Sequence, residues 1–129
     1  MAWVHLVTLL ALLEYLGFGV LVGRARGLYG IKAPATSGHE IFERYFRVQM
    51  NTLELLIVFV PALWMACSYW SAPWMAAVGA LYLLGRLLYL RAYVAAPRSR
   101  SLGFALSVVP IGFLLLATGA GALRTLTGW

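Results

Sequence analysis

Charged residues and cysteine are both scarce in this sequence of 129 residues. Only 11% of the residues are charged and 63% are hydrophobic, which gives a mean hydropathy of +0.86. Soluble domains carry about 25% charged and about 45–50% apolar residues, and disordered chains have low hydrophobicity. The composition therefore excludes both classes. The single cysteine, Cys67, also excludes an intrachain disulfide framework and a cysteine-based metal site.

Acidic residues are few as well, because four Asp and Glu stand against ten Lys and Arg. The resulting net charge is +6 and the isoelectric point is near 10.0. A basic balance can indicate a nucleic-acid-binding protein, but here the basic residues lie at the ends of apolar runs, where they set membrane topology. We therefore expect no nucleic-acid partner.

Long apolar runs fill the chain. A membrane-spanning helix takes about 20 apolar residues, so four spans and short loops use the whole length and leave no extramembrane domain. Because Met1–Leu13 contains no Lys or Arg, we interpret the first run as a retained span rather than a signal peptide. We predict an all-α integral membrane protein, a four-transmembrane-helix bundle that forms one domain over residues 1–129. The predicted spans are residues 3–22, 40–69, 74–95 and 102–123.

The basic residues also predict an orientation. Four antiparallel spans place the first and third connections on one side of the membrane, and that side holds nine of the ten basic residues. The positive-inside rule then puts both basic connections in the cytoplasm and both termini outside. The tryptophans fall toward the outer end, as an interfacial aromatic belt does. The compact length and the lack of a retention tail favour a bacterial inner membrane.

A polar stripe in the second span is the most informative segment. Ionisable groups at membrane depth cost about 2.5–3.5 kcal/mol each on insertion scales, and they mark partners, cavities or ligands. Arg47, Asn51 and Glu54 share one helix face by their i, i+4, i+7 spacing, whereas Gln49 points to nearly the opposite side. Polar groups in two directions predict an oligomer with this helix near its centre.

The third span carries a second polar face. Arg86, Tyr89 and Tyr93 fall at i, i+3 and i+7, and Tyr82 lies one turn earlier. A tyrosine stripe also suits plain packing or interface anchoring, but beside an intramembrane arginine it favours a pocket wall. The two faces together offer cations, one carboxylate, amides and phenols. They would complement a small zwitterion that has more carboxylates than amines.

Plain structural roles remain open for the charges nearer the interface. Glu40 and Arg44, and Glu43 and Arg47, have the i,i+4 spacing of simple helix ion pairs. No metal site is expected, because His39 has no second ligand at a usable spacing.

Two motifs resemble the family of membrane-associated proteins in eicosanoid and glutathione metabolism, the MAPEG family, and within it leukotriene C synthase and the microsomal glutathione transferases. The first is Glu43-Arg44-x-x-Arg47-x-Gln49-x-Asn51-x-x-Glu54; the second is Arg86-x-x-Tyr89-x-x-x-Tyr93, with Arg100 seven residues later. The resemblance implies a homotrimer in membrane lipid. It also implies that glutathione, the co-substrate, binds at each subunit interface, open toward the cytoplasm.

The same resemblance implies roles for single residues. One subunit would contact glutathione through Arg47, Asn51, Glu54, Tyr89 and Tyr93, and the neighbouring subunit through Arg26 and Gln49. Glu54 would hold the γ-glutamyl amine, Arg47 and Arg26 would hold carboxylates, and Arg86 would be a supporting residue. Arg100 matches the arginine that faces the thiol, which makes it the expected catalytic residue. Two positions depart from leukotriene C synthase: Leu55 replaces a tyrosine that contacts glutathione, and Gly27 replaces a second consecutive arginine.

Arg100 suits thiol activation on physical grounds. A free thiol titrates near pKa ~8.5 and only its thiolate is a good nucleophile, while a guanidinium is always charged. Placed beside the sulfur with water partly excluded, Arg100 would favour the thiolate. The expected function is that of a membrane glutathione S-transferase acting on lipophilic electrophiles, with glutathione peroxidase activity toward lipid hydroperoxides as an extension. On spacing alone, Arg100 equally suits a topology-setting loop charge, the role we expect for Arg91 and Arg98.

Two other functions are compatible with parts of the sequence. A non-catalytic lipid-binding or scaffold protein of the same fold would keep the spans without the chemistry. A small cation or drug exporter would use Glu14 in the first span, but that function leaves the polar stripe unexplained. Otherwise we expect Glu14 to be a hydrogen-bond partner between subunits or near the headgroups.

Overall fold

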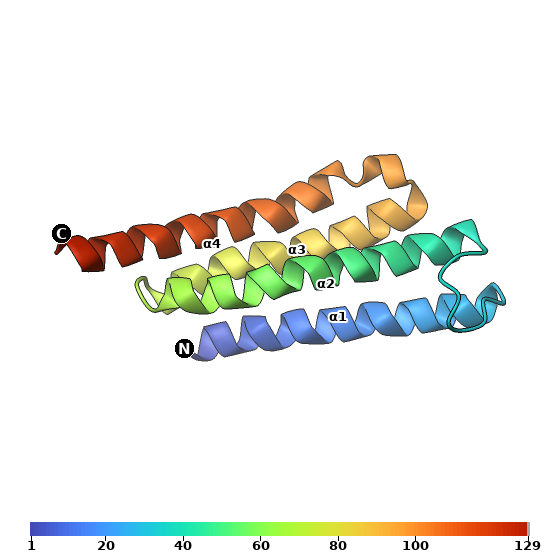
Figure 1. Cartoon of the computed structure of the whole chain (residues 1–129), viewed down its shortest axis with the longest axis horizontal. Helices are drawn as coiled ribbons and strands as arrows, with labels where there is room; N and C mark the ends of the chain where they lie inside the picture. Colours follow the sequence, from blue (N-terminus) through green and yellow to red (C-terminus); the bar gives the residue numbers. More distant parts are fainter. Residues whose placement is uncertain (129) are drawn as a thin grey trace.

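The computed structural model describes residues 1–128, and all the regular structure in that range is helical. Each long helix is long and apolar enough to cross a membrane. In Figure 1 the helices run side by side along one axis, and the α1–α2 connection lies at the end opposite the two termini. The elements are α1 (Ala2–Leu28), α2 (Glu40–Cys67), α3 (Ala72–Ala95), the short 3-10 helix η1 (Pro97–Ser99) and α4 (Ser101–Thr127).

Local signals explain where these helices begin and end. The Nδ1 atom of the N-cap residue His39 accepts a hydrogen bond from the Ile41 amide at 3.1 Å, which caps α2. Pro73 lies in the first turn of α3, where its missing amide hydrogen costs nothing. Gly128 ends α4 with a φ of +73°, in the left-handed region that glycine adopts easily.

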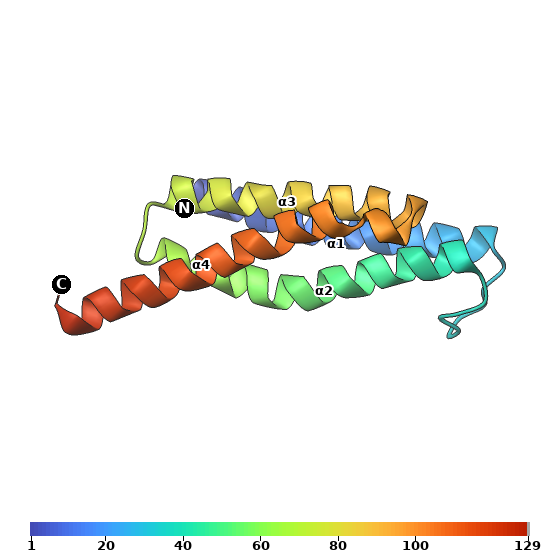
Figure 2. The same ribbon diagram turned by 90° about the horizontal axis from the view of Figure 1, so that it is seen from above.

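The helices α2 and α3 form the middle of the bundle. α1 packs against both of them, and α4 also packs against both. In Figure 1, α1 and α4 border the bundle on opposite sides, and Figure 2 shows α4 inclined to α2. α2 and α3 therefore each have helices on more than one side, and polar side chains between them, such as Thr52 and Arg86, are fully buried.

Two glycines bring α3 and α4 into close contact. A Cβ atom on Gly85 of α3 would lie 2.6 Å from the Leu106 carbonyl carbon, and one on Gly103 of α4 would lie 2.4 Å from the Tyr89 nitrogen. Only glycine fits backbones this close, as is common where membrane helices meet. This contact fixes the start of α4, and with it Arg100, next to Tyr89.

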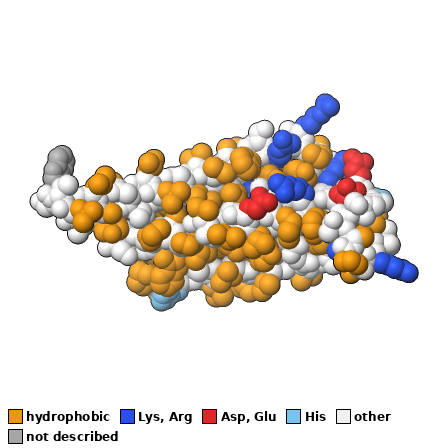
Figure 3. Space-filling view, in the orientation of Figure 1, with side chains coloured by type: hydrophobic (Ala, Val, Ile, Leu, Met, Phe, Trp, Pro, Cys, Tyr) orange, Lys and Arg blue, Asp and Glu red, His pale blue; other side chains and the backbone are white. Residues whose placement is uncertain are grey.

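The outer surface is apolar along most of its length. Leucines such as Leu16 and Leu116 are exposed, whereas Arg86 is fully buried. Figure 3 shows hydrophobic side chains over the body of this face, with Lys and Arg gathered toward the end that holds the α1–α2 connection. We call this end, which also holds η1, the basic end. An apolar body with a charged end suits a protein that spans a bilayer.

Candidate functional site

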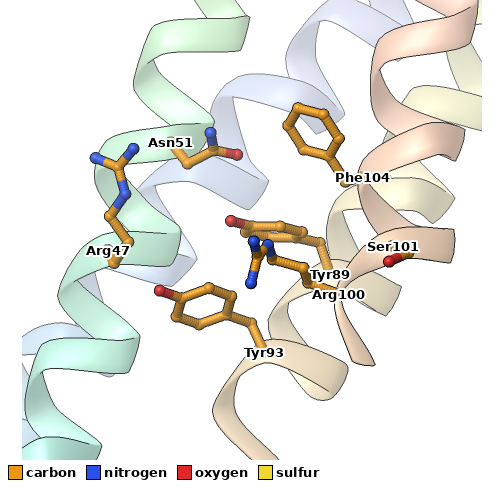
Figure 4. Close-up of a pocket in the computed structure, with 7 residues that line it drawn as sticks. All are labelled: Arg47, Asn51, Tyr89, Tyr93, Arg100, Ser101 and Phe104. Carbon is orange, nitrogen blue, oxygen red and sulfur yellow. The ribbon is translucent and has the colours of Figure 1, made fainter. Parts of the chain in front are cut away.

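A cavity of about 630 Å³ lies between α2, α3 and the start of α4, near the basic end. In Figure 4 the side chains that line it surround one space: two come from α2, two from α3, and the rest from the start of α4. Five of the predicted site residues are thereby brought together. The lining residues are Arg47, Asn51, Tyr89, Tyr93, Arg100, Ser101 and Phe104.

Arg47 on the α2 side of the cavity pairs with Glu54, which lies outside the cavity lining. Arg47 Nη1 donates to Glu54 Oε1 at 3.4 Å, and both side chains are more than half exposed, at 54% and 58%. A long, exposed pair of this kind is weak and exchanges partners easily. The predicted pair of Glu40 with Arg44 forms, but Glu43 accepts a hydrogen bond from the Gly38 amide rather than from Arg47. Arg47 and Glu54 are thus joined across two turns of the helix.

Asn51 is held at the cavity by a buried arginine. Arg86 Nη1 donates to Asn51 Oδ1 at 2.7 Å and to Thr52 Oγ1 at 3.2 Å, and Arg86 Nε donates to Ser107 Oγ at 2.9 Å. Because a guanidinium only donates, Asn51 must turn its oxygen toward Arg86. The amide nitrogen of Asn51 is then the group that remains for the cavity.

The predicted tyrosine face of α3 divides into two parts. Tyr89 and Tyr93 line the cavity with their rings stacked at 5.4 Å between centroids. Tyr82 is instead buried against Phe59 at 3.9 Å, and Arg86 is buried above the Tyr89 ring at 4.4 Å. Tyr82 and Arg86 therefore do not line the cavity with Tyr89 and Tyr93, because side chains of α2 and α4 pack against that part of α3.

Arg100 is the cation of the third connection that reaches the cavity. Its guanidinium points toward the two tyrosines in Figure 4, and its Nη1 donates to the Pro97 carbonyl at 3.0 Å. Ser99 ties the connection to the end of α3 through hydrogen bonds to the Ala92 and Ala96 carbonyls. Neither Arg91 nor Arg98 lines the cavity. Of the two arginines in this short connection, Arg100 therefore reaches the cavity and Arg98 does not.

Gln49 and Arg26 lie away from this cavity. Gln49 faces α1, where a Cβ on Gly19 would lie 2.8 Å from its Nε2 atom. Arg26 Nη1 donates to the Ala35 carbonyl at 2.7 Å, and its guanidinium lies over the Phe42 ring at 4.9 Å. Within one chain, Arg26 and Gln49 are therefore separate from the predicted glutathione residues that line the cavity.

Comparison with known families identifies the family of this chain. The model of the MAPEG family matches residues 4–120. The chain belongs to the MAPEG family. The predicted resemblance and the predicted all-α membrane bundle are both confirmed, since MAPEG proteins are helical membrane bundles and this chain has four long apolar helices among its described residues.

Relatives of this MAPEG protein match most of its length. An uncharacterized protein of Synechocystis sp. is 46% identical over 118 residues, which cover 92% of this chain and 85% of that protein. Human microsomal glutathione S-transferase 2 is 38% identical over 117 residues, covering 91% and 78%. Leukotriene C4 synthase of Cavia porcellus is 33% identical over 133 residues, covering 93% and 89%.

The two departures noted in the sequence lie outside the cavity lining. Leu55 is partly buried and packs against the main apolar core, and Gly27 has open space where a side chain would begin. Neither Leu55 nor Gly27 therefore contributes a side chain to the cavity of this MAPEG protein.

Sequence reasoning missed four residues that shape the cavity. Ser101 and Phe104 line it from the first turn of α4, and their position within four residues after Arg100 was the available signal. Thr52 and Ser107 accept hydrogen bonds from Arg86. Ser107 lies inside an apolar run and Thr52 directly follows Asn51, but only the packing of α2 and α4 around α3 shows that they meet the same side chain.

Proposed function

We propose that this MAPEG protein is a membrane glutathione S-transferase that joins the glutathione thiolate to lipophilic electrophiles. The observation that carries the proposal is the convergence of Arg47, Asn51, Tyr89, Tyr93 and Arg100 on one cavity. Relatives named as glutathione transferases support glutathione as the co-substrate.

The Arg47–Glu54 pair suits the γ-glutamyl end of glutathione, which carries an amine and a carboxylate on the same carbon. The carboxylate of this group would pair with Arg47 and its amine would pair with Glu54. Each side chain would then exchange one oppositely charged partner for another. Charge-assisted bonds of this kind are stronger than neutral ones. The Asn51 amide nitrogen and the two phenols would donate to the remaining carbonyl and carboxylate oxygens.

A homotrimer completes the proposed site. Gln49 of α2 faces α1, and Arg26 of α1 lies over Phe42 of α2, both outside the cavity lining of their own chain. With α2 near the centre of a trimer, these two residues of one subunit would approach the cavity of the next. Arg26 would then supply a second guanidinium for a carboxylate. The mass of the protein–detergent particle tests this arrangement, and a stable monomer would refute it.

Arg100 supplies the chemistry in this proposal. Its positive charge favours loss of the thiol proton to solvent, because a nearby cation stabilises the anionic form. The thiolate sulfur then forms a bond to the electrophilic carbon, and the leaving group departs with its electron pair. Phe104 and the exposed Leu102 at the start of α4 offer an apolar approach for the electrophile.

The location follows the charge distribution. We place the protein in a bacterial inner membrane with the basic end and the cavity on the cytoplasmic side and both termini outside. The Lys and Arg residues gathered at that end and the cyanobacterial relative support this placement. Glutathione is a cytoplasmic thiol, so this orientation gives it direct access.

The decisive experiment compares Arg100→Ala with Arg98→Ala in detergent. Conjugation of glutathione to an aryl halide should fall at least about tenfold in Arg100→Ala, which corresponds to one unit of thiol pKa. Arg98→Ala removes the same charge two residues away and outside the cavity, so its rate should stay near wild type. Equal rates in both variants would remove Arg100 from the mechanism. No conjugation and no ultraviolet thiolate absorption in the wild type would favour a non-catalytic lipid-binding or scaffold protein.

A further inference from the structure

The end of α3 determines where two side chains of the cavity lie. Tyr93 is in the last turn of α3, and the connection that follows through η1 leads directly to Arg100. The last four carbonyl groups of a helix have no amide partner within it. Ser99 Oγ donates to the Ala92 and Ala96 carbonyls at 2.9 and 2.7 Å, which ties the connection to this helix end. A movement of the helix end would therefore move both Tyr93 and Arg100.

Arg44 of α2 binds the same helix end. Its Nη1 atom donates to the Val94 carbonyl at 2.9 Å and to the Ala95 carbonyl at 3.4 Å. The last turn of α3 contains no basic residue of its own, and a cation near the C-terminus of a helix is stabilised by the helix dipole. Arg44 therefore supplies from α2 both the donor and the positive charge that this end of α3 lacks.

The ion pair of Arg44 lies in a more exposed place than its bond to Val94. The Nη2 atom of Arg44 donates to Glu40 Oε1, but the Glu40 side chain is 77% exposed, whereas that of Arg44 is only 18% exposed. Exposed ion pairs contribute little to stability, while the bond to the Val94 carbonyl is partly buried and joins two helices. The contact with α3 is therefore the one that we expect to matter for the site.

Arg44 does not itself line the cavity. It lines a second cavity, of about 440 Å³, that shares Arg47 and Tyr93 with the first. Arg44 is therefore next to the proposed glutathione site without being part of its wall. Its route to a molecule bound there runs through the end of α3.

We propose that Arg44 is a positioning residue of the transferase site, because its guanidinium holds the last turn of α3, and this turn holds Tyr93 and the connection that carries Arg100. The inference rests on the proposed glutathione site. The close contact at Gly103 fixes Arg100 from the α4 side, and Arg44 fixes it from the α3 side.

The first experiment measures the ionisation of bound glutathione in detergent. Arg44→Met keeps the apolar stem of the side chain but removes its donors and its charge. The ultraviolet absorption of the bound thiolate should then appear at a pH about one unit higher than in wild type, because Arg100 is no longer held beside the sulfur. The kcat of aryl halide conjugation at neutral pH should fall about tenfold with it. Arg44→Lys, which restores the charge and a donor, should recover part of both.

Glu40→Gln is the matched control, since it removes the carboxylate of the ion pair and leaves the bonds to α3 in place. Its pH profile and kcat should stay as in wild type. A folded Arg44→Met with a lowered Tm but an unchanged pH profile and kcat would overturn the positioning role, and so would a Glu40→Gln variant with the same shift as Arg44→Met. Should Arg44→Met fail to fold, Arg44→Gln takes its place.

Hydrogen exchange tests the contact without glutathione. The backbone amides of residues 92–100 should exchange faster in Arg44→Met than in wild type, because local opening of a helix end exposes its amides, and Glu40→Gln should match wild type. Equal exchange in all three proteins would overturn the claim that Arg44 holds the end of α3. A wild type that binds no glutathione would refute the proposed function itself, while the exchange rates would still decide whether Arg44 fixes this helix end.

Discussion

Substitution of Gly103 by alanine should damage the cavity without touching any group that lines it. A Cβ atom at this position would lie 2.4 Å from the Tyr89 nitrogen, 2.6 Å from the Tyr89 Cα and 2.9 Å from the Leu88 carbonyl carbon. Ordinary contacts of a Cβ atom begin near 3.4 Å. The shortest of these distances must therefore grow by 3.4 − 2.4, or 1.0 Å. Because the atoms on the other side belong to the backbone, no rotamer change can relieve the contact, and α4 must move away from α3.

This displacement acts where the chemistry is proposed. Arg100 lies three residues before Gly103, and Phe104 follows it directly, so both would shift away from Tyr89 and Tyr93. A misplacement of about 1 Å can cost about 100-fold in rate, and overpacking costs about 1–3 kcal/mol of stability. We therefore expect Gly103→Ala to lower both the aryl halide conjugation rate and the Tm.

The same helix provides matched controls. Gly112 and Gly119 have nothing within 4 Å of a built Cβ, so Gly112→Ala and Gly119→Ala add the same methyl group to open space. These variants should keep wild-type activity and gain slightly in helix propensity. If Gly103→Ala were as active and as stable as Gly112→Ala, the close contact of α3 and α4 would not position Arg100, and the reasoning would fail.

Two further predictions concern Glu54, the ion-pair partner of Arg47, and Ser107, a hydrogen-bond acceptor of Arg86. Glu54→Gln should weaken glutathione binding about tenfold in calorimetry, because one charge-assisted bond is lost. Its Tm should stay almost unchanged, because the Glu54 side chain is exposed and its pair with Arg47 is weak. A large drop in Tm would show that the pair is structural. Ser107→Ala should lower the Tm measured by differential scanning calorimetry by a few degrees. It leaves the buried Arg86 Nε without its acceptor, at a cost of about 1–3 kcal/mol. A Ser107→Ala variant as stable as wild type would mean that another acceptor replaces the hydroxyl.

The sequence was sufficient for the spans and for much of the cavity. Long apolar runs have few alternatives to membrane helices, and the i, i+4 spacing placed Arg47 and Asn51 on one face of α2. The helix ends differ from the predicted spans, since α1 continues to Leu28 beyond residue 22 and α4 to Thr127 beyond residue 123. Hydropathy marks where lipid ends, whereas a helix ends only where its hydrogen bonds stop.

The remaining features depend on how the helices pack. Periodicity put Tyr82, Arg86 and Tyr89 on one face of α3, but contacts with α2 and α4 hold the first two away from the cavity, whereas Tyr89 lines it. The close contact at Gly85 and Gly103 joins residues far apart in the chain. A single helix pattern contains no information about such a partner.

The ion pair between Arg47 and Glu54 also bears on which molecules the cavity rejects. Without a ligand each side chain already neutralises the other, so a fatty acid or an anionic lipid headgroup meets a guanidinium that is occupied. Such an anion would displace Glu54, whose exposed carboxylate would then be hydrated by water. A molecule that brings an ammonium and a carboxylate together satisfies both side chains at once. Because the pair is long and exposed, the preference that it gives to such a molecule over a single anion is small.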